Sequence, residues 1–181
     1  MKKPWEQTRV WKNESQYLNW IRGELRRMWS NYPIRTEFLD ESCREVTQEE
    51  KESKVYHPST RKVGQCTFCL GWFPKSKLEV DHKTPSNGCN SFDKVVDFLW
   101  YCGGTTKEDL QVVCKPCHKI KTYSERSGLS FEEAKLEKEV IAFKKMDAAS
   151  QQSLLSSLSL AEGKNTKERV DIYRGYLKGD K

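Results

Sequence analysis

Long hydrophobic runs are missing from this 181-residue sequence. It contains no stretch of about 18 apolar residues, so we expect no membrane-spanning helix. The first residues, MKKPWEQTRVWKNE, include basic side chains but no apolar segment after them, which argues against a secretory signal. Both absences predict a soluble protein of a reducing compartment, the cytoplasm. There, seven cysteines favour metal binding or free thiols over disulfides.

Apolar residues and histidines are also scarce. The hydrophobic fraction of 36% and the charged fraction of 32% make the chain too polar for one large core. The aromatic fraction of 11% is too high for simple disorder. A net charge of +6 permits a polyanionic partner without demanding one. Only three histidines are present, so a histidine beside another ionisable residue becomes a candidate for chemistry.

The N-terminal region is predicted to be helical. In NESQYLNWIRGELRRMWSNYP, Asn13 and Gln16 form a predicted capping box and Pro33 marks the end of the element. Apolar residues recur at steps of three and four, as on one face of a helix. These residues are Leu18, Ile21, Leu25 and Met28.

The C-terminal region shows the same kind of signal. Ser130 and Glu133 form a predicted capping box ahead of FEEAKLEKEVIAFKKM. Nearly all the cysteines lie between the two helical regions. We therefore predict a basic helical region at 1–60, a cysteine-rich domain at 61–127 and a helical extension at 128–181.

Two C-x2-C pairs dominate the central region. The pairs are CTFC and CKPC, and four thiolates from two such tight turns complete the tetrahedral shell that structural zinc prefers. The four residues are Cys66, Cys69, Cys114 and Cys117. The alternative to a shared metal site is that the cysteines form a pair of unlinked buried thiol clusters. The 44 residues between the pairs exceed the gap of a simple zinc ribbon, so a further segment is inserted there.

The inserted segment begins with KLEVDHKTP, a short strand that ends by placing Asp81 beside His82. His118 directly follows the second cysteine pair, and Asp109 lies just before that pair. If zinc joined the two pairs, one carboxylate and two imidazoles would gather in a small space. For an isolated His118, the favoured interpretation would be a fifth potential metal ligand or a surface histidine.

The combined pattern CTFC…LEVDHKTP…EDLQVVCKPCHKIKT resembles the HNH endonucleases, which have a ββα-metal active site. The resemblance covers about residues 61–123. The inserted segment is similar to small phage-encoded members, in which a short helix precedes the second cysteine pair. It implies an α+β fold: a small zinc-stabilised ββα-metal core with helical N- and C-terminal extensions.

The resemblance also implies roles. His82 matches the general base, and Asp81 and His118 match the ligands of one catalytic divalent ion, Mg²⁺, Mn²⁺ or Ni²⁺. The four cysteines match the structural zinc site. Asp109 stands where the family usually has an asparagine that orients the base, and its carboxylate oxygen still offers an acceptor to an imidazole N–H.

Several basic residues are candidates for contact with DNA phosphates, which need positive neutralisers. Each has the alternative of a solvated helix face. They are Arg22, Arg26, Arg27, Lys119 and Lys121. We interpret the aromatic and apolar residues of the inserted helix as its packing face: Phe92, Phe98, Leu99 and Trp100.

The function predicted from these features is metal-dependent cleavage or nicking of DNA by phosphodiester hydrolysis, in the host cytoplasm if the chain is phage-encoded. Two alternatives remain open. One is a zinc-dependent DNA-binding protein without catalysis, which the aspartate at position 109 favours. The other is an accessory factor that acts with phage packaging proteins. The sequence does not determine the oligomeric state.

Overall fold

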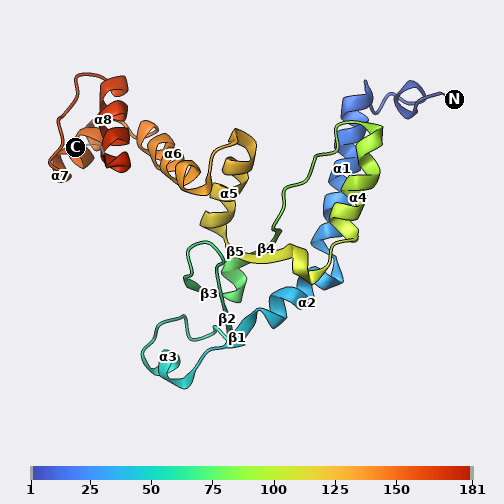
Figure 1. Ribbon diagram of the computed structural model, residues 1–181, viewed down its shortest axis with the longest axis horizontal. Helices are drawn as coiled ribbons and strands as arrows, with labels where there is room; N and C mark the ends of the chain where they lie inside the picture. The colour runs from blue at the N-terminus through green and yellow to red at the C-terminus, as the bar shows by residue number, and fades with distance from the viewer. Residues whose placement is uncertain (1, 180–181) are drawn as a thin grey trace. The chain divides into compact units, whose positions relative to one another are not determined.

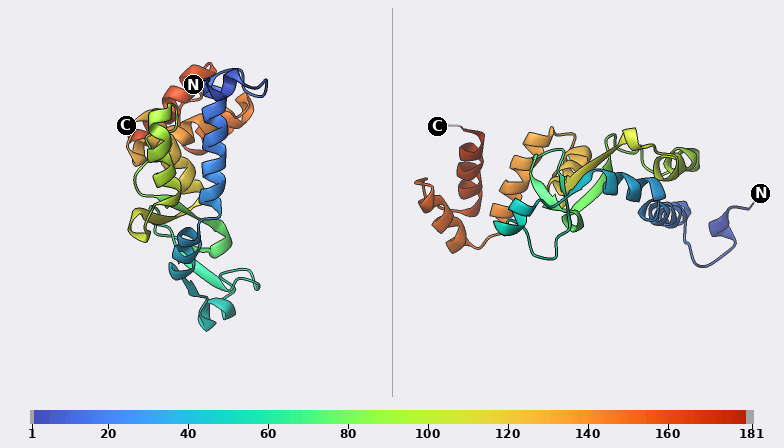
Figure 2. Two further views of the ribbon diagram at one scale, coloured as in Figure 1. Left: turned by 90° about the vertical axis from the view of Figure 1, so that its right-hand side faces the viewer. Right: turned by 90° about the horizontal axis from the view of Figure 1, so that it is seen from below.

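The computed structural model of the protein describes residues 2–179 (Figures 1 and 2). The chain forms two compact units, Met1–Cys117 and His118–Lys181. The division falls inside helix α5 (Lys115–Ser127) and does not coincide with the predicted boundaries. The three-part division of the sequence analysis therefore stays a prediction. Both helices and small antiparallel sheets are present, so the fold is mixed.

The first unit contains every described strand. Its elements in chain order are η1 (Pro4–Glu6), α1 (Glu14–Ser30), α2 (Pro33–Glu41), β1 (Cys43–Glu45), α3 (Gln48–Glu52), β2 (Lys62–Gln65), β3 (Trp72–Pro74), η2 (Lys75–Lys77), β4 (Leu78–His82), η3 (Phe92–Lys94), α4 (Val95–Gly103), η4 (Lys107–Asp109) and β5 (Leu110–Cys114), which leads directly into α5.

Helices α1 and α4 lie side by side in both ribbon views (Figures 1 and 2). The Asn13 side chain accepts a hydrogen bond from the Gln16 amide and is the N-cap of α1. The Gln16 side chain accepts from the Lys12 amide instead of that of Asn13, so the predicted capping box is only half formed. Pro33 begins α2, because proline tolerates the first turn of a helix but not its interior. The packing of α1 on α4 joins buried and half-buried residues, namely Cys89, Phe98, Cys102, Ile21, Leu25 and Trp29.

The predicted packing face of the inserted helix is partly wrong. Phe98 is buried, but Leu99 and Trp100 are 43% and 67% exposed, and Phe92 also reaches solvent. The reason is geometric: consecutive residues of a helix point about 100° apart, so Phe98, Leu99 and Trp100 cannot all face α1.

The strands form two antiparallel sheets. The first sheet has the order β1-β2-β3, and the second pairs β4 with β5 from Leu78 opposite Cys114 to His82 opposite Leu110. Along β4, Leu78, Val80 and His82 are buried, whereas the intervening residues are half-buried. This alternation is the period of two that a strand imposes. It places Asp81 and His82 on opposite faces of the sheet.

The second unit is a small helical bundle that follows the start of α5. Its helices are α6 (Phe131–Lys144), α7 (Ala148–Ser157) and α8 (Thr166–Lys178). Ser130 and Glu133 form the predicted capping box of α6. The core consists of Val140, Phe143, Leu155 and Val170. Among the described helices, none combines the length and the apolarity needed to cross a lipid bilayer.

Candidate metal centre and histidine site

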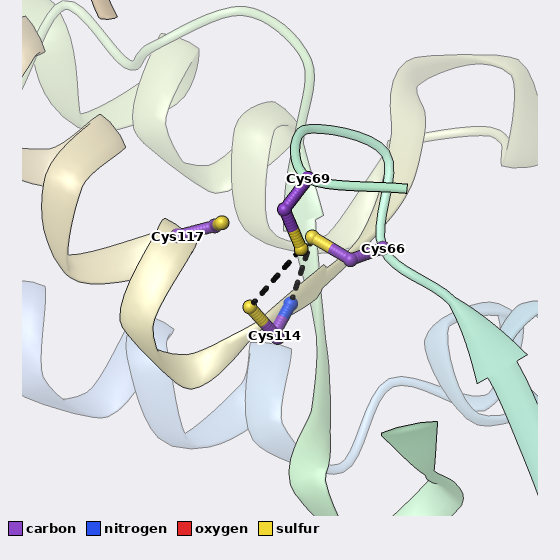
Figure 3. A group of neighbouring side chains, drawn as sticks. All are labelled: Cys66, Cys69, Cys114 and Cys117. Carbon is purple, nitrogen blue, oxygen red and sulfur yellow. Dashed lines mark hydrogen bonds between the residues drawn. The ribbon is translucent and has the colours of Figure 1, made fainter. Parts of the chain in front are cut away.

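The four predicted cysteines come together in the first unit (Figure 3). Their sulfur atoms all lie within 4.8 Å of one another, and Cys69 Sγ is 4.0 Å from Cys114 Sγ. Tetrahedral zinc–thiolate bonds of about 2.3 Å place the sulfurs about 3.8 Å apart. The cluster therefore needs to contract by less than about 1 Å to hold a metal ion. Four thiolates at this spacing fit structural zinc.

The first cysteine pair is held by a tight turn between β2 and β3. The Cys66 carbonyl accepts a hydrogen bond from the Leu70 amide, and the Cys66 amide donates to the Gly71 carbonyl. Leu70 has a positive φ of 57°. Residues other than glycine rarely adopt this left-handed backbone conformation. A Cβ atom at Gly71 would lie 2.9 Å from the Phe73 ring. A side chain at position 71 would therefore force this ring to move.

The second cysteine pair spans the junction of β5 and α5. Cys114 ends the strand, and Cys117 lies in the first turn of the helix. The Cys114 amide donates a hydrogen bond of 3.3 Å to Cys66 Sγ, which links the two pairs directly. The Thr67 amide and hydroxyl both donate to the Val112 carbonyl at 2.9 Å. These bonds link the two pairs through the backbone as well as through the sulfur atoms.

The thiol groups differ in their acidity. Burial raises the pKa of Cys66, but hydrogen bonds from the backbone of Cys69, Cys114 and Phe68 lower it by more, to about 7. Burial raises the pKa of Cys114, and burial together with the neighbouring thiols raises that of Cys117. Four adjacent thiolates repel one another unless a cation neutralises them. The cluster is thus suited to a metal ion rather than to four free thiolates.

His82 is enclosed by two aromatic rings. Its ring centroid lies 4.2 Å from that of Trp29 and 3.8 Å from that of Tyr101, and the residue is 5% exposed. Trp29 comes from α1 and Tyr101 from α4. The two packed helices, α1 and α4, therefore each contribute one ring to the enclosure.

The tautomer of His82 follows from its hydrogen bonds. Nε2 lies 2.7 Å from the Tyr101 carbonyl and 3.2 Å from Thr105 Oγ1. The Thr105 hydroxyl donates its own hydrogen to the same carbonyl at 2.7 Å. Both neighbours are then acceptors toward the imidazole, so Nε2 carries the hydrogen. In the neutral ring, the lone pair is left on Nδ1.

The Asp109 side chain is hydrogen-bonded within its own turn. Its carboxylate accepts hydrogen bonds from the Thr106 amide and hydroxyl, which cap η4, and these bonds lower its pKa. Its backbone carbonyl accepts from the Lys83 amide, one residue after His82. Asp109 is therefore a neighbour of the His82 strand, and its orienting role stays a prediction.

The two predicted ligands of the catalytic ion lie on different elements. Asp81 is half-buried on β4, on the face of the sheet opposite to His82. Its strand partner is Gln111, whose side-chain amide donates to the His82 carbonyl. His118 is half-buried and follows the zinc-site residue Cys117 on α5.

The predicted DNA-contacting residues fall into two groups. On α1, Arg26 and Arg27 are exposed, Arg22 is half-buried, and Arg27 forms a 2.8 Å ion pair with Glu24. On α5, Lys119 is exposed. Lys121 is 8% exposed and pairs with Glu125, so its ammonium group is already neutralised.

Sequence reasoning missed Trp29, Tyr101 and Thr105 as neighbours of His82. A backbone carbonyl has no sequence signature, so nothing in the sequence identifies Tyr101 as an acceptor. Trp29 lies four residues after Leu25, on the same helical face, and this spacing was the one available signal.

No protein-family model matches this sequence, and searches of curated proteins and of solved structures return no match. What the chain shares with the HNH endonucleases is thus the residue pattern alone. The four-cysteine cluster is the part of that pattern whose side chains are gathered within 4.8 Å.

Proposed function

We propose that the protein is a metal-dependent DNA endonuclease of the HNH type. One observation carries the proposal: the Tyr101 carbonyl holds His82 in a single tautomer. His82 lies on β4, and β5, the strand paired with β4, ends at a cysteine of the four-cysteine cluster. A buried histidine with one nitrogen fixed as a donor is prepared to accept a proton at the other. With α4 inserted between the two strands, the chain order β4, β5, α5 is the order expected of a ββα core.

In the proposed reaction, Nδ1 of His82 takes a proton from a water molecule. The water oxygen attacks the phosphorus atom, and the bond to the 3′-oxygen breaks. The leaving oxygen is protonated, giving 3′-hydroxyl and 5′-phosphate ends. The imidazolium that forms donates to the Tyr101 carbonyl and lies between two aromatic faces, and both contacts favour its positive charge.

Asp81 and His118 are the proposed ligands of the catalytic ion. A carboxylate oxygen and an imidazole nitrogen suit Mg²⁺, Mn²⁺ or Ni²⁺, and so small a ligand set leaves positions for water and phosphate. When bound, such an ion supplies positive charge that offsets the charge developing on the phosphoryl and leaving oxygens. Because Asp81 and His82 face opposite sides of β4, one can bind the ion without displacing the other from its base role.

Zinc at the four cysteines has a structural role in this proposal. It joins the turn after β2 to the β5–α5 junction, and β5 in turn pairs along the whole length of β4. The register that places His82 opposite Leu110 then depends on the metal-linked strand. Among the DNA-contacting candidates we retain Arg22, Arg26, Arg27 and Lys119. We leave out Lys121 because it is buried as well as paired with Glu125, whereas Arg27 remains exposed beside Glu24.

The test is a supercoiled-plasmid assay on zinc-loaded protein with Mg²⁺, Mn²⁺ or Ni²⁺. We expect the wild-type protein to nick the plasmid and His82→Ala to lose this activity. His57→Ala is the matched control, because His57 is exposed and its side chain bonds only to Ser59 among the contacts described. Failure of folded wild type to cut with any ion, or full activity in His82→Ala, would refute the proposal.

A second candidate is a zinc-dependent DNA-binding protein without catalysis. The observation that favours it is the burial of His82, which is only 5% exposed. In that case, His82 serves as a packed core residue between Trp29 and Tyr101. The same plasmid assay separates the two candidates: the binding protein retards the plasmid on a gel but never changes its topology.

A further inference from the structure

Helices α5 and α6 line an open cavity of about 300 Å³ in the second unit, with a strongly basic lining. Three cationic side chains come together there, and no carboxylate is among the lining residues that the structure describes. The lining consists of His118, Lys119, Thr122, Tyr123, Arg126 and Lys138.

The cavity is built by helical periodicity. On α5, Lys119, Thr122 and Arg126 follow at steps of three and four and therefore share one face. Lys138 comes from α6, and its ammonium lies 5.3 Å from the centroid of the Tyr123 ring. This cation–π contact holds the ammonium against α5.

The acidic residues of both helices are occupied elsewhere. On α5, Glu125 pairs with Lys121. On α6, Glu137 forms a 3.1 Å ion pair with Arg174 of α8. The remaining carboxylates of α6 line a separate cavity, together with Lys135: Glu132, Glu133 and Glu139. No acidic side chain of α5 or α6 is thus left in the described lining to neutralise the basic cavity.

We propose that this cavity binds a backbone phosphate of the DNA substrate. The inference rests on the proposed function, because His118 is the proposed ligand of the catalytic ion and also lines this cavity. Phosphate oxygens accept hydrogen bonds from guanidinium, ammonium and hydroxyl groups. Arg126 supplies a guanidinium fork, Lys119 and Lys138 supply ammonium groups, and Thr122 supplies a hydroxyl.

The test measures DNA binding without catalysis. Full-length, zinc-loaded protein is titrated onto a fluorescent duplex without a catalytic divalent ion, from about 50 to 200 mM salt. We expect the double variant Arg126→Gln, Lys138→Gln to bind all duplex sequences more weakly. The slope of log K against log salt should become shallower by about 1, as for one lost phosphate contact.

Lys135→Gln is the matched control. Like Lys138→Gln, it removes one positive charge from α6, but at the acid-lined cavity, so its slope should equal that of the wild type. If the double variant has the same slope as Lys135→Gln, the proposal is wrong. If Lys138→Gln disturbs the packing on Tyr123, the slope is measured for Arg126→Gln alone, which is at an exposed position.

Two further outcomes separate this inference from the proposed function. A protein that never cuts plasmid but shows the altered slope would refute the nuclease and support the phosphate cavity. Wild type and double variant that both cut, with equal slopes, would refute the cavity alone. If calorimetry showed that the double variant loses binding of inorganic phosphate while its DNA slope is unchanged, the cavity would belong to free phosphate and the proposal would fail.

Discussion

The ring of His82 stacks on the ring of Tyr101 at 3.8 Å, and its Nε2 atom donates to the backbone carbonyl of the same residue at 2.7 Å. One residue of α4 therefore both covers the imidazole and sets its tautomer. The Tyr32 hydroxyl donates in turn to the Thr105 carbonyl at 3.0 Å. This bond ties the segment after α4 to the junction of α1 and α2.

Thr105→Val tests the hydrogen bonds around His82. The variant keeps the shape of the side chain but removes the second acceptor of Nε2, which lies 3.2 Å away. We expect kcat for plasmid nicking to fall about tenfold, with KM little changed, because the base is less well oriented. Thr105→Ser restores the hydroxyl and should restore kcat. An unchanged kcat and pH profile in Thr105→Val would show that the hydroxyl plays no part.

Trp29→Leu tests the aromatic enclosure. An aromatic pair contributes about 0.5–1.5 kcal/mol beyond the area it buries, so we expect the free energy of unfolding to fall by at least about 1 kcal/mol. Trp100→Leu is the control, because Trp100 is 67% exposed on the neighbouring helix. Its effect should stay within about 0.5 kcal/mol. Urea denaturation followed by circular dichroism measures both, and equal losses would contradict the stacking role.

Removal of metal from the four-cysteine cluster should unfold the first unit. Structural zinc contributes about 10–16 kcal/mol in zinc-finger peptides, which equals or exceeds the whole stability of a typical domain. We expect a strong chelator, or Cys117→Ser, to abolish the cooperative thermal transition of this unit. Cys43→Ser leaves the cluster intact and should retain zinc. A melting curve that the chelator does not change would rule out a structural metal.

Asp109→Asn should leave the fold intact. The asparagine side chain keeps an oxygen that accepts from the Thr106 amide, and it removes one negative charge next to the His82 strand. We expect unchanged zinc content and thermal stability, and nicking that is retained or faster. Loss of nicking in a folded variant would show that the carboxylate itself is required.

The N-cap of α7 should make stability depend on pH. Hydrogen bonds from the Ser150 amide and hydroxyl lower the pKa of Asp147. A carboxyl whose folded pKa is depressed stabilises the fold above its unfolded pKa of about 3.9, and this contribution disappears as the pH falls through the folded value. Asp147→Asn keeps an acceptor but does not titrate. The melting temperature of wild type relative to this variant should therefore decrease below about pH 4, and a constant difference would contradict the cap's titration.

The sequence by itself determined the features that depend on local spacing. Two C-x2-C pairs identify Cys66, Cys69, Cys114 and Cys117, because a tight turn brings residues three apart to one ion. Strict alternation in LEVDH predicts the strand β4, and the side chains of Asn13 and Ser130 predict the starts of α1 and α6. Each of these signals acts over a few residues, so the order of residues is sufficient.

Only the tertiary structure decided which groups meet across long separations. Every residue carries a carbonyl, and the packing of α4 against α1 selects that of Tyr101 as the acceptor for His82. Likewise, all lysines look alike in sequence. The fold buries Lys121 beside Glu125 and places Lys138 over Tyr123 in the basic cavity. Hydrogen bonds and ion pairs act over a few ångströms in space, and chain folding alone sets those distances.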